Sequence, residues 1–262
     1  MIASQGNAGP PQGSLTPAGD GSRKAATWGR SVPLGADRAD RTDAATPGPE
    51  IVVLTAHPQM EHSRINRRLM HAARQPAAAG AAPSIVVRDL YALYPDYLID
   101  TAAEQALLAS AQLIVWQHPI HWYSMPPLMK LWVDEVLAFG WAYGPGGTAL
   151  RGKDLWLVAT SGGPEASYHP GSYNRYFFDA FLPPYEQTAH LCGMRFLPPL
   201  LLHGAHRAEE AEIAAHVAVY AQRLASYPRW PELDELLYGL TTQVPEDARP
   251  DESLTQSQTE HA

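Results

Sequence analysis

Five short apolar runs, separated by segments with helical periodicity, constrain the fold of this 262-residue chain more than any other feature. The runs are continuous rather than alternating in polarity, which is typical of strands buried on both faces of a parallel sheet. We therefore predict five strands. They cover residues 51–54, 84–87, 113–116, 155–159 and 196–202, the last of them interrupted at Pro198 and Pro199.

The segments between the runs carry apolar residues at helical spacing. We predict that Ser63 and Ser124 cap two helices, and that three more cover 102–110, 173–191 and 209–226. The second of these three is expected to break near Pro183 and Pro184. Strands that alternate with helices predict an α/β protein with a parallel sheet covered on both faces. Five such strands match a doubly wound, flavodoxin-like sheet with strand order 2-1-3-4-5, in a single domain.

The two ends of the chain differ from its middle in composition. Residues 1–49 are rich in Gly, Pro, Ala, Ser and Thr, and residues 240–262 are polar and acidic, so we expect both to be disordered around a domain at 50–239. The formal net charge is −8 and no basic stripe appears, which argues against nucleic acid as a partner. No signal peptide or membrane-spanning stretch is recognisable, and the one cysteine, Cys192, fits a reducing compartment. We expect a cytoplasmic protein.

Ligands of doubly wound sheets bind at the carboxyl ends of the strands, near the point where the strand order reverses. His57 follows the first run, and the next helix opens with Ser63, Arg64, Ile65 and Asn66. A helix N-terminus offers free N–H groups and a positive dipole end, which together favour a phosphate group. No GxGxxG motif is present, and a plain helix cap is the alternative interpretation.

Two further loops are expected at the same edge of the sheet. The third run is followed by Ile120, His121, Trp122 and Tyr123, a polar and aromatic loop suited to a flat heterocycle, although a core anchor is the alternative. A metal site at this loop is disfavoured, because recognisable further ligands are missing from its sequence. The fourth run is followed by small residues, which let backbone approach a ligand closely or simply form a turn. These residues are Thr160, Ser161, Gly162 and Gly163. Three converging loops predict a ligand that has both a phosphate and a flat ring.

Several motifs occur in a fixed order along the chain. Ala56-His57-Pro58 follows the first run, and a tyrosine-rich stretch at 90–96 follows the second. They are followed by the stretches 115–119, 122–124, 140–147 and 191–194. Together these motifs resemble the flavodoxin-like NAD(P)H:quinone oxidoreductases, and most closely the Kef-type ancillary proteins of glutathione-gated potassium-efflux systems. The likeness runs from about 51 to 205 and is most specific from Trp116 to Gly152.

The resemblance implies a homodimer that binds FMN, with FAD less favoured, and transfers hydride from NADH or NADPH to the flavin and then to a quinone. It implies that His57 and residues 63–66 surround the flavin phosphate, and that 120–123 and 160–163 flank the isoalloxazine ring. It places Tyr168 where these quinone reductases carry an active-site tyrosine. His169 follows directly, which is not the family's spacing of tyrosine and histidine, and His121 stands where relatives often carry glutamine.

A second function stays open, because residues 164–168 and 173–176 are more similar to a regulatory subgroup. The chain would then be an ancillary subunit of a glutathione-gated potassium/proton antiporter, with the flavin as a structural or redox-sensing group. A flavodoxin-like electron carrier is disfavoured, since the resemblance lies with enzymes that use nicotinamide. Weak support for the dimer comes from Trp122, Trp132, Trp141 and Tyr143, for which core packing is the alternative.

Overall fold

The computed structural model describes residues 50–75, 83–234 and 236. Its centre is a five-stranded sheet in which each pair of neighbouring strands is parallel. The strands are β1 (Ile51–Thr55), β2 (Ile85–Asp89), β3 (Leu113–Pro119), β4 (Asp154–Thr160) and β5 (Arg195–Leu202). Their order is β2-β1-β3-β4-β5, which confirms the predicted flavodoxin-like topology. The predicted disorder of the two tails lies outside the described residues and stays a prediction, as do the domain boundaries.

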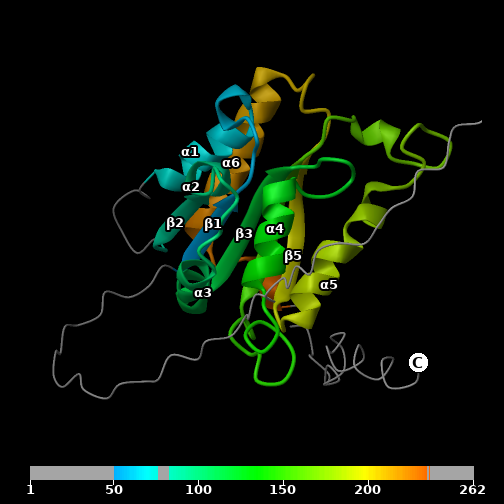
Figure 1. Cartoon of the computed structure of the whole chain (residues 1–262). Coiled ribbons are helices and arrows are strands. Elements are labelled where there is room, and N and C mark those ends of the chain that lie inside the picture. The colour runs from blue at the N-terminus through cyan, green and yellow to red at the C-terminus, as the bar shows by residue number, and fades with distance from the viewer. Residues whose placement is uncertain (1–49, 76–82, 235, 237–262) are drawn as a thin grey trace, which may run out of the picture. The chain divides into compact units, whose positions relative to one another are not determined.

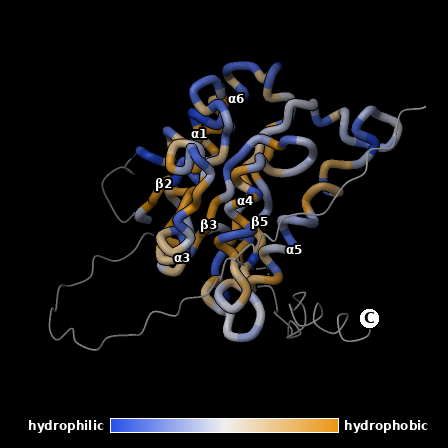
Figure 2. Tube along the Cα trace, viewed as in Figure 1, coloured by the Kyte–Doolittle hydropathy of each residue, from blue (hydrophilic) through white to orange (hydrophobic). Residues whose placement is uncertain are grey.

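Helices cover both faces of the sheet (Figure 1). One face packs against α3 (Thr101–Ser110), α4 (Pro127–Val136) and α5 (Pro183–Leu191), and the other against α1 (Asn66–Arg74) and α6 (Glu210–Ser226). A short helix, α2 (Leu90–Leu93), follows β2 and was not predicted. Side chains of the central strands alternate between two apolar clusters, and Figure 2 shows these strands among the most hydrophobic parts of the chain. This burial on both faces explains the continuous apolar runs.

Two local predictions were wrong. Ser124 does not cap α4, because it is paired with His121 in a tight turn and Pro126 directly precedes the helix. Residues 173–177 are not helical, because the chain turns at Arg175 with a φ of 63°, and helix resumes only at the short 3-10 turn Phe178–Phe181 and at α5. The strand β5 continues through its prolines, and the predicted interruption at Pro198 and Pro199 takes the form of a register shift. Trp156 pairs with Leu197 and Val158 with Leu200, which an edge strand tolerates.

Within the described part of the chain, every helix is too short or too polar to cross a membrane.

His118 on β3 is a buried, uncharged histidine in the core. Its side chain is fully buried, its ring stacks on that of Tyr185 at 5.7 Å, and Nδ1 lies 3.0 Å from the carbonyl oxygen of Pro119. Since a carbonyl only accepts, Nδ1 carries the proton and Nε2 is left without a partner. Burial lowers the pKa of His118 to about 4, and the neighbouring His121 contributes in the same direction. Protonation therefore disfavours the folded state.

We expect His118 to make the cofactor-free protein less stable as pH falls from 6.5 toward 4, because the unfolded chain binds this proton first. At pH 4.5 the loss relative to pH 7 is about 2.5 kcal/mol. Urea unfolding at both pH values measures this loss. Between pH 7 and pH 4.5, the unfolding free energy of His118→Gln should fall by less than that of the wild type, and the difference should equal this amount. His169→Gln, at an exposed position, is the control. An equal pH dependence in wild type and His118→Gln would contradict the assignment.

Candidate functional site

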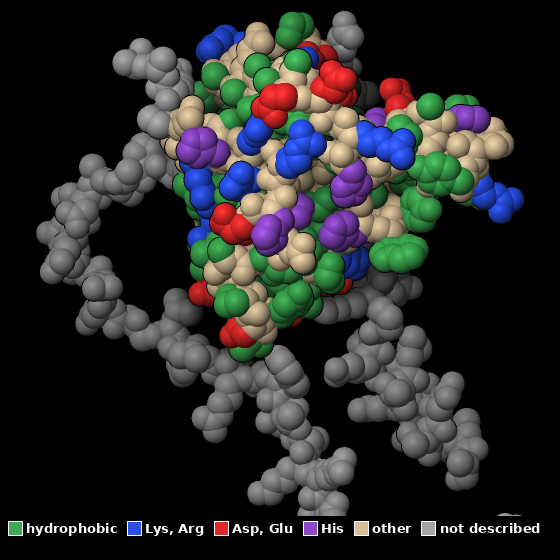
Figure 3. All heavy atoms as spheres, turned by 90° about the horizontal axis from the view of Figure 1, so that it is seen from above, with side chains coloured by type: hydrophobic (Ala, Val, Ile, Leu, Met, Phe, Trp, Pro, Cys, Tyr) green, Lys and Arg blue, Asp and Glu red, His purple; other side chains and the backbone are tan. Residues whose placement is uncertain are grey.

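A pocket of about 650 Å³ lies at the carboxyl ends of β1, β3 and β4. The loops after all three strands contribute to its wall, together with Ala205 and His206 after β5. Most of the residues predicted to bind a cofactor line it. They are His57, Ser63, Arg64, Ile65, Asn66, Ile120, His121, Thr160, Ser161 and Gly162. Figure 3 looks onto the molecule from above and shows several histidines among arginine and lysine side chains.

The start of α1 forms one wall of the pocket. The Ser63 hydroxyl accepts a hydrogen bond from the Asn66 N–H at 3.0 Å, as expected of a capping residue, although Ile65 directly precedes the helix. The remaining N–H groups of the first turn have no partner within the helix. With the dipole of α1, they give this wall the character of an anion site.

Asn66 holds a buried amide oxygen that lacks a hydrogen-bond partner. The side chain is 2% exposed, Nδ2 donates to Thr160 Oγ1 at 3.0 Å, and Oδ1 is unpaired. The backbone of Asn66 is fixed as well, because its carbonyl accepts from Gln117 Nε2 at 2.9 Å. Since the Thr160 hydroxyl can donate as well as accept, the amide can also turn over and aim its NH₂ group at a ligand. Buried polar groups are normally satisfied, so a polar ligand fits this position.

The ionisable side chains in the pocket lining are all basic. They are Arg64 and the histidines His57, His62, His121 and His206, and none of the described residues that line the pocket is acidic. Burial lowers the pKa of His57, and the nearby His121 adds to this effect. Nδ1 of His57 accepts from the Gln59 N–H at 3.1 Å, so a neutral His57 carries its proton on Nε2. The pocket thus offers N–H donors without a competing carboxylate, which suits a phosphate.

The turn after β3 presents its aromatic residues away from the pocket. His121 and Ser124 exchange two backbone hydrogen bonds of 2.9 and 3.0 Å, and Trp122 and Tyr123 between them have φ values of 49° and 65°. Two positive φ angles define a type I′ turn, for which Asn-Gly is the favoured pair, so the two aromatics carry backbone strain. Trp122 is 93% exposed and the Tyr123 ring stacks on Phe181 at 5.0 Å. Neither residue lines the pocket, in contrast to what the resemblance implies for the isoalloxazine ring.

The loop after β4 divides into two parts. Ser161 and Gly162 line the pocket, and a Cβ atom on Gly162 would lie 3.2 Å from Nε2 of His206. Gly163 does not line the pocket, and a Cβ atom there would lie 2.9 Å from the Ser167 hydroxyl oxygen. The missing side chain at Gly163 therefore makes room for the side chains of Ser167, Tyr173 and Asn174.

Tyr168 is buried behind this loop and does not line the pocket. Its ring centroid lies 5.1 Å from Phe178 and 5.4 Å from His203, which follows β5. His169, the next residue in sequence, is exposed, and its Nδ1 lies 2.7 Å from the carbonyl oxygen of Pro170. His203 and His206 were not predicted, because only the ends of the first, third and fourth strands were considered. Their position after β5 was the signal that pointed to them.

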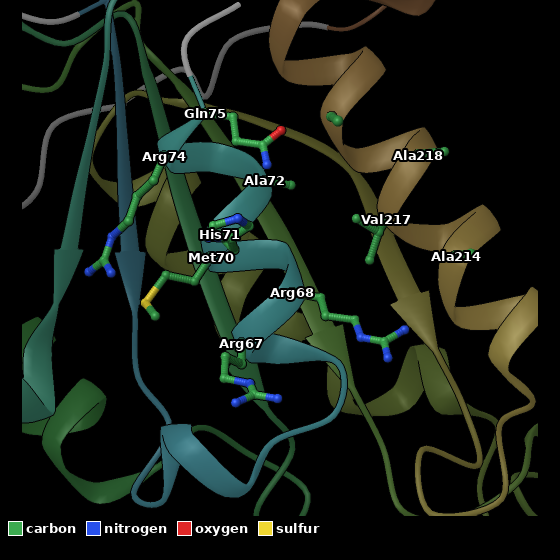
Figure 4. Close-up of a pocket in the computed structure, with 11 residues that line it drawn as sticks. Arg67, Arg68, Met70, His71, Ala72, Arg74, Gln75, Ala214, Val217 and Ala218 are labelled. Carbon is green, nitrogen blue, oxygen red and sulfur yellow. The ribbon is translucent and has the colours of Figure 1, made fainter.

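A second hollow of about 790 Å³ lies between α1 and α6, away from the carboxyl ends of the strands (Figure 4). Ala214, Val217 and Ala218 of α6 line it, and Arg67 and Arg68 of α1 lie at one end. None of the predicted site residues lines this hollow. Nowhere in the described ranges do three or more His, Cys, Asp or Glu side chains gather as a metal site would need.

The comparisons with known proteins agree with this fold. A family model described as "Flavodoxin-like fold" matches residues 49–224. The glutathione-regulated potassium-efflux system ancillary protein KefF of Citrobacter koseri is 46% identical over 177 residues, which cover 68% of this chain and 96% of that protein. General stress protein 14 of Treponema denticola, solved in complex with FMN, is 36% identical with a TM-score of 0.61, over 67% of this chain and 98% of that one.

An NADPH-quinone reductase from P. pentosaceus shares the fold at 24% identity, with a TM-score of 0.58 over 66% of this chain and 96% of that one. The family match spans more than half of the 262 residues, and the KefF protein is matched over nearly its whole length. These findings confirm the resemblance that the motifs indicated. The chain belongs to the family with the flavodoxin-like fold, as a relative of the KefF ancillary proteins.

Proposed function

We propose that this protein binds FMN in the pocket at the carboxyl ends of β1, β3 and β4 and acts as an NAD(P)H:quinone oxidoreductase. The observation that carries the proposal is the buried amide of Asn66 at a helix N-terminus, inside a pocket lined by basic groups. One end of this amide lacks a partner, and it becomes a donor to the phosphate when the amide turns over on Thr160. The FMN complex of the Treponema denticola relative and the quinone-reductase fold relative support the choice of ligand and reaction.

The chain's own residues would divide the work of binding. Ser63, Arg64 and the N–H groups of α1 hold the phosphate, and His57 donates to it through Nε2. Ile120 and His121 would lie on one side of the ring, and residues 160–162 would lie on the other. When bound, FMN would accept hydride from NADH or NADPH and pass it to a quinone. Tyr168 lies outside the pocket lining and packs against His203, so it would influence the ring through that histidine.

The first test uses the purified full chain loaded with FMN under anaerobic conditions. Addition of NADH, and separately of NADPH, should bleach the flavin absorbance, and a quinone should restore it. Flavin that binds but stays oxidised with both nucleotides would refute the enzymatic function. A chain that retains no FMN after incubation with an excess would refute the flavin site itself.

A second candidate function is a regulatory ancillary subunit of a potassium/proton antiporter, at the cytoplasmic face of a membrane. The observation that favours it is the 46% identity to a protein named as an ancillary protein of a potassium-efflux system. Co-purification with such an antiporter, and faster potassium efflux from vesicles that contain both, would support it. Failure to bind or activate the antiporter, in either redox state of the flavin, would refute it.

We also propose a homodimer through an exposed aromatic patch formed by Trp122, Tyr123, Tyr173, Tyr176 and Phe177. Trp122, Tyr173 and Phe177 are 93%, 70% and 62% exposed. The rings of Tyr123 and Tyr176 both contact Phe181, which joins the β3 turn to the segment before α5. Aromatic residues are enriched in protein interfaces. Of the other aromatics considered for the dimer, Trp132 is fully buried in the core.

The double variant Trp122→Asn/Tyr123→Gly should convert the dimer to a monomer without destabilising the fold. Asn and Gly are the residues that a type I′ turn favours, so the strained turn relaxes while its aromatic surface is lost. Light scattering should give twice the chain mass for the wild type and the single mass for the variant. A wild-type mass of one chain would refute the dimer, and a dimeric variant would refute this interface.

A further inference from the structure

His203 is the side chain that ties the pocket to the aromatic cluster behind it. Its Nδ1 lies 2.8 Å from the hydroxyl oxygen of Ser161, a pocket residue that is 2% exposed. On its other sides the imidazole ring packs against Phe178, with centroids 4.7 Å apart, and against Tyr168 at 5.4 Å. The ring is thus held between two aromatics with one nitrogen directed at the pocket loop.

The loop itself is attached to the end of β5 by backbone hydrogen bonds. The Ser161 N–H donates to Leu202 O at 2.9 Å, and the Ala205 N–H donates to Ser161 O at 2.9 Å. The Gly204 N–H donates to Gly163 O at 2.8 Å. The position of Ser161 and Gly162 in the pocket wall is therefore set by the residues around His203 rather than by the sequence of the loop after β4.

The hydrogen-bond chemistry assigns the proton on His203. The Ser161 hydroxyl donates its one proton to the Gly163 carbonyl at 2.9 Å, and that carbonyl can only accept. The contact between Ser161 Oγ and His203 Nδ1 is then a hydrogen bond only if Nδ1–H is the donor. The chain of donors therefore runs from His203 through Ser161 to Gly163.

We propose that His203 is a positioning residue whose Nδ1–H orients the Ser161 hydroxyl and so preforms the part of the flavin-pocket wall that Ser161 and Gly162 form. This inference rests on the proposed function, because the wall is useful only if a ring binds against it. His203 needs no contact with the ligand for this role. A side chain that places a donor at the same distance from its Cα atom should replace it, and a side chain of the same shape without a donor should not.

The test compares His203→Asn with His203→Leu, two substitutions of nearly equal shape. The asparagine NH₂ stands close to where Nδ1–H stood, so its FMN dissociation constant, measured by fluorescence quenching, should stay within about twofold of wild type. Leucine should weaken FMN binding by about three- to tenfold, the worth of one net hydrogen bond. The double variant Ser161→Ala/His203→Leu should lose no more FMN affinity than the weaker-binding of the two single variants. Both substitutions break the same series of hydrogen bonds from His203 through Ser161 to Gly163. His169→Gln, an exposed neighbour of Tyr168, is the matched control.

A readout that needs no FMN comes from the ¹⁵N shifts of the imidazole in the cofactor-free protein, which should report the Nδ1–H form of His203. The Nε2–H form, or equal FMN affinity in the Asn and Leu variants, would overturn the inference. If the wild type binds FMN and all variants bind it equally, this inference fails and the proposed function stands. If the wild type binds no FMN, the proposed function fails, and the inference about the pocket wall fails with it.

Discussion

Glu104→Ala should lower the free energy of unfolding by about 3–5 kcal/mol, because it removes the acceptor of a buried charged network. Glu104 on α3 is fully buried. Its Oε1 accepts from Arg88 Nε at 3.0 Å and from the Tyr94 hydroxyl at 2.6 Å, and a further hydrogen bond joins it to Arg88 Nη2. Its Oε2 accepts from Trp132 Nε1 at 3.1 Å. Alanine would leave the guanidinium, the phenol and the indole N–H without this partner.

Urea denaturation monitored by circular dichroism measures this loss, with Glu135→Ala as the control. Glu135 is an exposed glutamate on α4, so its removal should change the unfolding free energy by no more than about 0.5 kcal/mol. The network joins β2, α3, α4 and Tyr94, the residue after α2, so the transition should remain a single cooperative one. A loss below about 1 kcal/mol for Glu104→Ala would show that water replaces the carboxylate.

Asn66→Asp should weaken FMN binding by at least about a hundredfold, if the phosphate lies where we propose. The substitution keeps the shape of the side chain and places a carboxylate in the pocket wall, at a residue that is 2% exposed. Two unit charges of the same sign 4 Å apart repel each other by about 4 kcal/mol at an effective dielectric constant of about 20, which is about a thousandfold in affinity. Because an acidic residue is favourable at a helix N-terminus, α1 should still form.

Equilibrium dialysis or fluorescence quenching with FMN gives the affinity of each variant. Gln75→Glu is the control, because it changes the net charge by the same amount at the residue that follows the other end of α1. This variant should bind FMN as the wild type does. Equal unfolding free energies for the two variants would exclude misfolding as the cause. Wild-type affinity in Asn66→Asp would place the phosphate elsewhere and remove the basis of the proposed site.

The fold could be predicted from the sequence because its signals are local. Five continuous apolar runs and the helical spacing between them depend only on neighbouring residues, and the structure confirms every predicted strand and the strand order. The errors arose where tertiary packing overrides local preference. Ser124 resembles a helix cap but closes a turn with His121, and the helical spacing that begins at Tyr173 is broken by a turn at Arg175.

The candidate site was predicted in part for the same reason. The start of α1 and the small residues after β4 carry recognisable local signals, and the known geometry of doubly wound sheets brings them together. Trp122, Tyr123, Gly163 and Tyr168 were expected at the ligand, yet the structure places them outside the pocket lining. Their side-chain directions depend on backbone φ angles and on the packing of residues 167–181, which no periodicity in the sequence encodes.

The sequence by itself determined the class of fold and the helix terminus that faces the pocket, since these follow from polarity patterns over a few residues. The strand order was predicted by matching five alternating strands to the doubly wound topology. Only the tertiary structure decided that His203 reaches Ser161 and that Glu104 gathers Arg88, Tyr94 and Trp132. These partners are separated by 10 to 42 positions along the chain. Their contacts exist because strand register and loop conformation bring distant residues within hydrogen-bond distance, and neither is set by local sequence.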